Sequence, residues 1–257
     1  MPAGKTILTV HDCGILKGLG GIKFHLMKWL WFTLPSRHAS QITVNSEATK
    51  WDLLSYIRYE PERIKVIHIC VGSQFTASPK IFNSIKPVIL QIGTAENKNL
   101  KRIIPALQGI PCQYIIIGKL DTNVKGLLAE HAIEYQSIER ALSEDELLHQ
   151  YQACDILSFV STLEGFGMPI VEANGVGRVV ITGNTSSMPE IAGDAAHLVD
   201  PMDISAIREG FLKVIDDAGY RNQLIENGFQ NVKRFDKKRI GDEYFSLYRR
   251  MAEGGRR

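Results

Sequence analysis

Short apolar segments alternate along the chain with longer segments in which apolar and polar residues repeat at helical spacing. The short segments are rich in valine and isoleucine and apolar on both faces, as in parallel strands that helices cover on both sides. This alternation predicts a doubly wound α/β fold. The predicted strands are residues 7–10, 42–44, 66–69, 88–92, 114–117, 156–160 and 179–182.

Helices are predicted between these strands and throughout the last fifth of the chain. Earlier helices follow Ser46, Asn97 and Ser143, and the last of these has an acidic first turn that suits a helix N-terminus. Pro105 is expected to kink or end the second. After Asp203, three stretches carry apolar stripes at i, i+3 and i+4, which predicts three amphipathic helices.

A polar segment at residues 72–86 interrupts the alternation, and we interpret it as the boundary between two α/β blocks. The first block supplies about three strands and the second about six, the number in a doubly wound nucleotide-binding sheet. The first block is therefore incomplete, and its strand 7–10 is expected to form an unpaired edge. The predicted domains are a partial N-terminal Rossmann-like domain at 1–74, a linker at 75–86, a second Rossmann-like domain at 87–235, and a helix returning to the first domain at 236–257.

Composition narrows the function classes. Hydrophobic residues make up 44% of the 257 residues, enough for a substantial core, and the net charge of +2 does not favour nucleic-acid binding. The four cysteines are far apart, so we expect free thiols rather than a zinc or redox motif. The chain has no apolar run of membrane-spanning length and no signal peptide at its start, which predicts a cytoplasmic protein.

The densest chemical signal is the segment STLEGFGMPIVE, in which a buried strand runs into a glycine-containing loop and then a helix. Gly165 and Gly167 allow close approach of the backbone to a ligand, and Pro169 suits the first helical turn. The amides of Phe166, Gly167 and Met168 are then expected at a helix N-terminus, where they can bind an anion.

Two acids flank this predicted anion site. Glu164 precedes the glycine loop, and Glu172 lies about one turn into the helix. Carboxylates beside an anion site are unfavourable for phosphate alone, but they can accept hydrogen bonds from the hydroxyls of a ribose or a sugar. The alternative is an ordinary strand-to-helix turn with solvated glutamates. The restrictive E-G-F-G-x-P-x-x-E spacing favours a ligand that carries both phosphates and hydroxyls.

This segment resembles the retaining family 4 glycosyltransferases of GT-B fold, also called glycosyl transferases group 1. In that family, two glutamates separated by seven residues flank a G-F-G-x-P loop. Glu164 and Glu172 match this pair. The resemblance implies that Glu164 contacts the donor sugar and that Glu172 holds the ribose.

The segment VILQIGTAENKNLKRII resembles the family's strand, glycine turn and Lys-Asn pair that bind the donor phosphates. The resemblance thus assigns donor binding to Gly93, Thr94, Lys98 and Asn99. A lysine at a helix N-terminus opposes the helix dipole, and a bound diphosphate would remove that conflict. A solvated surface lysine is the alternative. Many family members have arginine where this chain has Thr94, so the phosphate clamp has one cation fewer.

The N-terminal segment ILTVHDCGIL resembles the family's strand that ends in His-Asp. In the family, this histidine lies in the cleft between the domains, near the donor sugar and the acceptor. That role is carried here to His11. A histidine that hydrogen-bonds only within the fold is the alternative.

The resemblance implies transfer of a sugar from a nucleoside diphosphate sugar to a glycan or lipid-linked acceptor in cell-envelope polysaccharide synthesis, with retention of anomeric configuration. No metal or other cofactor is expected. Two alternatives stay open: an inactive nucleotide-sugar-binding module, either truncated or part of a split enzyme, and a GT-B epimerase. Aromatic and basic residues at 22–38 suit a peripheral membrane contact. The other interpretation is a helix packed on the sheet.

Overall fold

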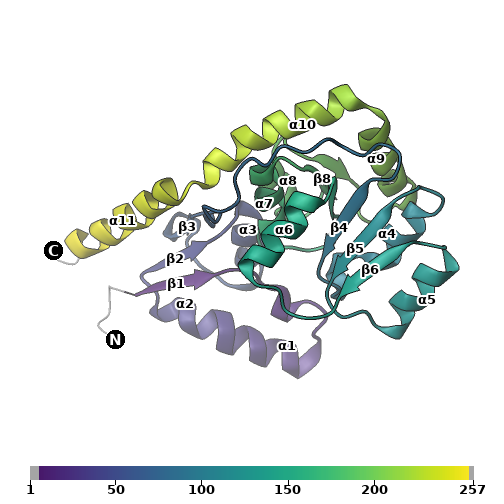
Figure 1. Ribbon diagram of the computed structural model, residues 1–257. Helices are drawn as coiled ribbons and strands as arrows, with labels where there is room; N and C mark the ends of the chain where they lie inside the picture. The colour runs from purple at the N-terminus through teal and green to yellow at the C-terminus, as the bar shows by residue number, and fades with distance from the viewer. Residues whose placement is uncertain (1–5, 255–257) are drawn as a thin grey trace. The chain divides into compact units, whose positions relative to one another are not determined.

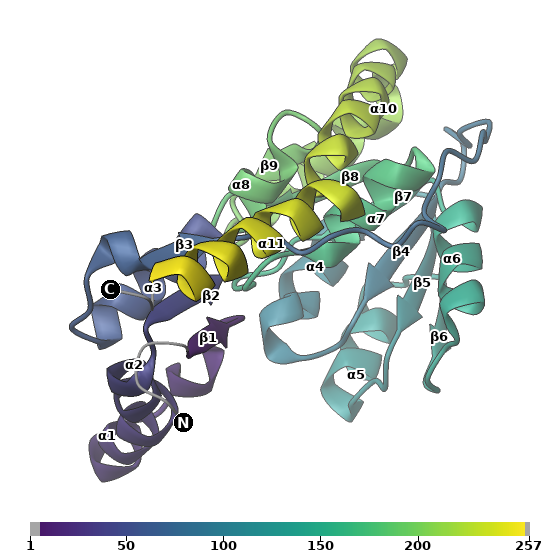
Figure 2. The same ribbon diagram turned by 90° about the vertical axis from the view of Figure 1, so that its left-hand side faces the viewer.

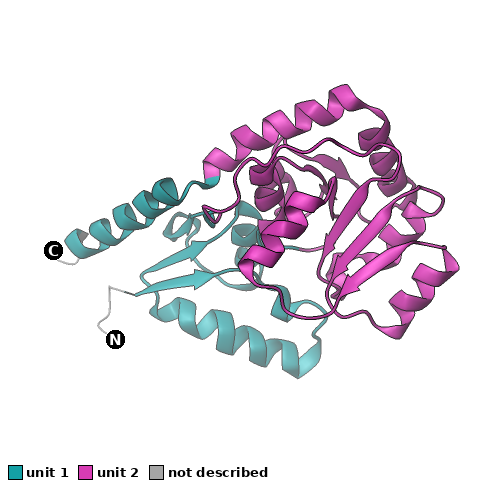
Figure 3. Cartoon of the chain, in the orientation of Figure 1, with its two compact units in different colours: residues 1–70, 164–166, 235–257 teal, residues 71–163, 167–234 magenta. Residues whose placement is uncertain are grey.

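The computed structural model describes residues 6–254, and the chain divides into two compact units (Figure 3). Of the described residues, unit 1 contains 6–70, 164–166 and 235–254, and unit 2 contains 71–163 and 167–234. The outermost residues of the predicted first and last segments, 1–5 and 255–257, lie outside the described part. Three residues of the glycine loop thus belong to unit 1, whereas the chain on both sides of them belongs to unit 2.

Unit 1 is built on a three-stranded parallel sheet in the order β1-β2-β3. The strands are β1 (Ile7–Val10), β2 (Gln41–Val44) and β3 (Ile64–Val66). Within the described residues β1 is an edge strand, as predicted. The third strand ends where the sequence predicted it to begin. Ile67 donates one more hydrogen bond to Val44, and the chain then leaves the ladder.

Side chains of this sheet alternate between two apolar clusters, as expected for strands covered on both faces. The first cluster joins the sheet to α1 (Gly21–Lys28), η2 (Trp29–Thr33) and α3 (Glu47–Tyr56). It also includes Ala39, which directly follows α2 (Leu34–His38). Its strand residues are Leu8, Val10, Ile42, Val44, Ile64 and Val66. On the other face, Ile7 and Ile67 pack with Ile240 and Leu247 of α11 (Lys237–Gly254).

Unit 2 contains a six-stranded parallel sheet in the order β6-β5-β4-β7-β8-β9 (Figure 1). Its strands are β4 (Val88–Ile92), β5 (Gln113–Ile117), β6 (Tyr135–Ile138), β7 (Ile156–Phe159), β8 (Val179–Gly183) and β9 (His197–Val199). The four inner strands agree with the sequence prediction. The two edge strands, β6 and β9, were not predicted.

Helices cover both faces of this second sheet. They are α4 (Leu100–Leu107), α5 (Thr122–Glu130), α6 (Glu144–Ala153), α7 (Met168–Val176), α8 (Met188–Ala192), α9 (Ile204–Asp216) and α10 (Ala218–Asn231). In Figure 2, α4 and α5 lie on one face of the sheet and α6 on the other. Pro105 stands inside α4, which ends two residues later. The last helices confirm the amphipathic pattern read after Asp203.

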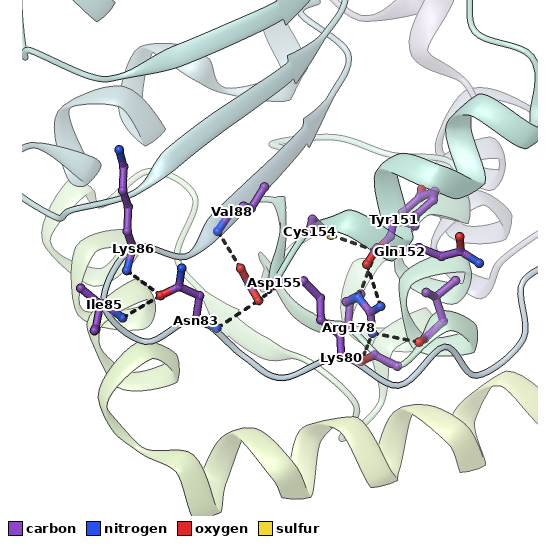
Figure 4. Close-up of polar contacts among 12 residues, drawn as sticks. Lys80, Asn83, Ile85, Lys86, Val88, Tyr151, Gln152, Cys154, Asp155 and Arg178 are labelled. Carbon is purple, nitrogen blue, oxygen red and sulfur yellow. Dashed lines mark hydrogen bonds and ion pairs between the residues drawn. The ribbon is translucent and has the colours of Figure 1, made fainter.

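Residues 72–86, which we call the strap, pack on the rest of unit 2. The ring of Phe75 is buried edge-on against Tyr151, with 5.5 Å between ring centroids. Lys80 forms an ion pair with the buried carboxylate of Asp155 (Figure 4). This carboxylate also accepts hydrogen bonds from the amides of Asn83 in the strap and Val88 in β4.

Two further sequence expectations concern cysteines and membrane spans. The four cysteines are free thiols. Burial raises the pKa of Cys13 and Cys154 to about 12, so these thiols stay protonated. Within residues 6–254, no helix combines the length and the apolar character that crossing a bilayer requires.

Candidate functional site

The order of strands in unit 2 places a crevice between β4 and β7. From β4 the chain proceeds to β5 on one side, and β7 lies on the other side. This reversal is a topological switch point, where open parallel sheets bind ligands beyond the carboxyl ends of their strands. The two loops singled out by the sequence leave the sheet here. Gly93 follows β4, and the glycine loop follows β7.

Lys98 lies between these two loops. Its ammonium nitrogen is 4.7 Å from the centroid of the Phe159 ring, a cation–π distance. A β-carbon on Gly93 would come within 3.0 Å of Cε of Lys98, and one on Gly167 would lie 3.6 Å from the same phenyl ring. Lys98 and Gly167 therefore both lie against the Phe159 ring at the switch point, and Gly93 lies against the side chain of Lys98.

Asparagine side chains hold the turn after β4 in place. Asn97 donates to the carbonyl of Leu163 at 2.9 Å, and its own carbonyl accepts from the amide of Thr162 at 2.8 Å. These bonds tie the turn after β4 to the loop after β7. The sequence marked Asn97 only as the residue before a predicted helix, and that helix, α4, begins at Leu100.

Asn99 is held within unit 2 by hydrogen bonds of its own side chain. It is buried in the left-handed conformation, with φ of 63°, between the short 3₁₀ turn Glu96–Lys98 and α4. Its amide nitrogen donates to the carbonyls of Val160 and Pro201, at 3.1 and 2.6 Å. Asn99 thus fixes the turn that carries Lys98. Lys98 ends that turn and precedes the first residue of α4 by two positions.

Thr94 also has a partner within unit 2. Its hydroxyl donates to the carbonyl of Lys119 at 2.8 Å, which links the turn after β4 to the end of β5. A β-carbon on Gly118 would approach the Thr94 methyl to 2.8 Å, so the glycine is needed for this contact.

Helix α7 begins where the sequence predicted. Met168 is its first residue, and Pro169 lies in its first turn, where a missing N–H costs no hydrogen bond. Gly167 caps the helix with φ of 110°, a conformation that L side chains rarely adopt. This nine-residue helix therefore begins beside the Phe159 ring, which lies close to its cap residue Gly167.

Glu172, one turn into α7, is half-buried and paired. The hydroxyl of Tyr151 donates to its Oε2 at 2.5 Å. Burial raises the pKa of Glu172, and this hydrogen bond opposes the rise by stabilising the carboxylate. Burial, with the adjacent carboxylate, raises the pKa of Tyr151 well above its ordinary value, so the phenol stays a donor. Sequence reasoning did not identify Tyr151.

The other predicted residues lie in unit 1. His11 is exposed and directly follows β1. A β-carbon on Gly165 would overlap the carbonyl oxygen of His11 and lie 2.8 Å from Cβ of Asp12. The backbones of the glycine loop and the β1 end are therefore in contact. This contact brings Glu164, the neighbour of Gly165, to the same end of β1 as His11.

The side chain of Phe166 is an anchor for this part of the loop. It is buried, and its ring centroid lies 5.9 Å from that of His68 and 5.6 Å from that of Phe235. The phenyl ring packs into unit 1, which leaves only its backbone for the predicted contact with a donor.

Unit by unit, the structure groups the predicted residues as follows. In unit 2, Gly93, Lys98 and Gly167 meet at the switch point, while Glu172 is held by α6. In unit 1, His11 and Glu164 share the end of β1. Among residues 6–254, no cluster of three or more His, Cys, Asp or Glu side chains is arranged to hold a metal ion.

The strand order and the two loops are those of doubly wound proteins that bind nucleotides at this crevice. The chain matches the family described as glycosyl transferases group 1 over residues 74–231, more than half of its length. The protein belongs to this family.

Two curated relatives span most of the chain. O-antigen chain mannosyltransferase B of Escherichia coli is 26% identical over 235 residues, covering 82% of this chain and 61% of that protein. MMP alpha-(1->4)-mannosyltransferase of Mycolicibacterium hassiacum is 22% identical over 226 residues, covering 83% and 54%. The chain therefore spans little more than half the length of these relatives.

Solved structures are similar over nearly the whole chain. Sucrose-phosphate synthase from Thermosynechococcus elongatus aligns with a TM-score of 0.82 and 18% identity, covering 97% of this chain and 68% of that one. Anabaena HepE in complex with UDP and glucose aligns with a TM-score of 0.79 and 19% identity, covering 94% and 70%. These similarities confirm the predicted GT-B fold class.

Proposed function

We propose that this protein transfers a sugar from a nucleoside diphosphate sugar to a glycan or lipid-linked hydroxyl, with retention of anomeric configuration. The observation that supports this most directly is at the switch point of unit 2, where Lys98 and Gly167 lie against Phe159 and Gly93 lies against Lys98. A cation beside a helix N-terminus is suited to a diphosphate. The names of the mannosyltransferase relatives support a hexose as the transferred group and a polysaccharide as the product.

In the proposed reaction, the bond between the anomeric carbon and the diphosphate oxygen breaks as the acceptor oxygen bonds to that carbon. The proton of the acceptor hydroxyl passes to the departing diphosphate. Charge then develops on the departing diphosphate. Lys98 and the amides of Gly167 and Met168 would stabilise it electrostatically, without a metal or other cofactor. Glu172 would accept hydrogen bonds from the ribose, and Asn99 would position the turn that bears Lys98.

Unit 1 would supply the groups for the sugar and the acceptor. Glu164 would position the donor sugar, and His11 would contact the acceptor side. Both residues lie at the end of β1, which supports their acting at the same place, where the donor sugar meets the acceptor.

A nucleotide-sugar-binding module without catalysis is the second candidate, and Thr94 at the usual arginine position favours it. Incubation with a panel of UDP-, GDP- and ADP-sugars, with and without acceptor glycans, separates the two. Release of nucleoside diphosphate together with a glycosylated product supports transfer. Binding of the diphosphate without release or product supports the module and overturns the proposed reaction.

Lys98→Ala is expected to weaken binding of the matching nucleoside diphosphate by about 1–3 kcal/mol, the range for hydrogen bonds to charged groups. The bare nucleoside should bind equally well to both proteins, because it carries no phosphate. Isothermal titration calorimetry measures both. Lys101→Ala, which removes an exposed lysine three residues later in α4, is the matched control and should change neither affinity. Equal diphosphate affinity in the Lys98 variant would remove this lysine from the site.

We also propose that this protein is cytoplasmic and that it contacts anionic membrane lipid peripherally through α1 and η2. Ile22, Leu26, Trp29 and Leu30 recur at helical spacing and are exposed, 87% in the case of Ile22, and Trp31 is exposed beside them. Between Asp12 and Glu47 the sequence has no acidic residue but has four lysines and arginines. Exposed tryptophans among basic residues suit an anionic interface.

Vesicle sedimentation tests this contact. The wild type is expected to sediment with phosphatidylglycerol vesicles and much less with phosphatidylcholine. The double variant W29A/W31A should bind the anionic vesicles with an affinity at least about fivefold lower than that of the wild type. Trp51→Ala, which removes an exposed tryptophan of α3, should bind like the wild type. Wild-type protein that stays in the supernatant with both vesicles excludes the proposal.

A further inference from the structure

Two hydroxyls at the start of α3 converge on one carbonyl of the glycine loop. Ser46 Oγ donates to the carbonyl oxygen of Gly165 at 2.7 Å, and Thr49 Oγ1 donates to the same oxygen at 3.0 Å. Both side chains are buried. All three residues belong to unit 1.

The hydrogens of the two hydroxyls allow both bonds together with the helix cap. Ser46 is the N-cap of α3, and its oxygen accepts from the amide of Thr49 at 3.0 Å. Accepting one hydrogen bond leaves the hydroxyl hydrogen of Ser46 available for Gly165. The hydroxyl of Thr49 points between two carbonyls and lies closer to Gly165 than to His11, at 3.0 against 3.4 Å.

A second serine cap in the chain shows what α3 would need for helix formation alone. Ser143 caps α6, and Glu146, three residues later, completes a capping box by bonding back to the Ser143 amide. In α3 the equivalent third position is Thr49, a poorer helix former than glutamate. Its hydroxyl oxygen lies 3.0 Å from Oγ of Ser46 and 3.0 Å from the carbonyl oxygen of Gly165. The threonine therefore contacts the glycine loop as well as the helix cap, and the cap alone does not require that second contact.

The held carbonyl lies beside the residues proposed for chemistry. Gly165 follows Glu164 directly, and its α-carbon is packed against the carbonyl of His11. Fixing the Gly165 carbonyl therefore fixes the backbone from which Glu164 projects.

We propose that Ser46 and Thr49 are positioning residues, which hold Glu164 at the end of β1 in the orientation that sugar transfer requires. This inference rests on the proposed function. The hydroxyls touch no substrate, and their effect is expected in the turnover rate more than in the binding of donor.

The variants are Thr49→Val, which replaces the hydroxyl with a methyl group of similar size, and Thr49→Ser, which retains the hydroxyl. Thr49→Val is expected to lower kcat about tenfold or more, because small displacements of a positioned group reduce rates strongly, while the donor KM changes less than about twofold. Thr49→Ser should recover most of the lost rate. Ser46→Ala should lower kcat similarly, and Ser143→Ala, the matched cap in α6, should leave kcat unchanged.

Hydrogen–deuterium exchange of the peptide 160–168 supplies a readout independent of activity. Faster exchange there in Thr49→Val, but not in Ser143→Ala, is expected. Unchanged exchange overturns the hydroxyl contact, and changed exchange with an unchanged kcat overturns the positioning role. If the wild type transfers no sugar, the proposed function fails and the positioning role with it, while exchange still reports separately on the contact.

Discussion

Gly165→Ala is expected to reduce sugar transfer by about a hundredfold and to lower the free energy of unfolding by about 1–3 kcal/mol. The added methyl group would overlap the carbonyl oxygen of His11, a backbone atom that cannot rotate away as a side chain would. The loop would have to withdraw from the end of β1, and Glu164 would move with it. Urea denaturation and release of nucleoside diphosphate measure the two effects.

Gly126→Ala is the matched control for this substitution. Gly126 lies inside α5, and a β-carbon there would meet no atom within 4 Å. Alanine should therefore stabilise the protein slightly, by about 0.5–1 kcal/mol, because glycine is a poor helix former. A Gly165 variant as stable and active as the wild type would contradict the contact between the loop and His11.

Asp155→Ala is expected to lower the free energy of unfolding of unit 2 by about 3–5 kcal/mol, the range for breaking a buried ion pair. Its side chain is 1% exposed and pairs with Lys80. It also accepts hydrogen bonds from the amides of Asn83 and Val88, at 3.2 and 2.8 Å (Figure 4). Alanine would leave these strap and β4 groups without their acceptor. Thermal and urea unfolding followed by circular dichroism measures the loss.

The strap contains its own control for that prediction. Lys86 forms an ion pair with Glu134 at 2.7 Å, but the glutamate side chain is 64% exposed. Glu134→Ala should cost less than about 1 kcal/mol, because water screens and replaces the interaction. Equal losses in the two variants would mean that burial does not set the strength of the Asp155 contacts.

Strands buried on both faces could be predicted from the sequence, and edge strands could not. The inner strands β4, β5, β7 and β8 consist mostly of apolar residues, and each contains at least two valines, isoleucines or leucines in succession. In contrast, β6 begins with the exposed Tyr135 and Gln136, and β9 is only three residues long. Their apolar signal is weak because one side of each faces no further strand among the described residues.

The end of β3 shows a second limit of pattern reading. Residues 66–69 are as apolar as a strand, yet the strand is Ile64–Val66. Ile67 is buried against α11, a helix more than a hundred and fifty residues later in the chain. Apolar character reports burial, and only the distant partner decides whether the segment stays in the ladder.

At the candidate site, local motifs were predictable and their support was not. The glycine loop and the start of α7 follow from the spacing of glycine and proline. Tyr151, Ser46 and Thr49 touch the loop or its acids only because distant segments meet in the fold. A serine before a helix signals a cap, and nothing in the sequence reports a second bond from the same hydroxyl.

The division of the chain between units also constrains the construction of chimeras within this family. Residues 164–166 lie inside the stretch of sequence that forms the six-stranded sheet, yet they belong to unit 1. A hybrid that exchanges that sheet for a homologous one would import a foreign tripeptide to face the native start of α3. Restoring the original residues 164–166 in the exchanged sequence should restore their contacts with the start of α3. In a chimera, this tripeptide should therefore come from the same parent as the N-terminal segment.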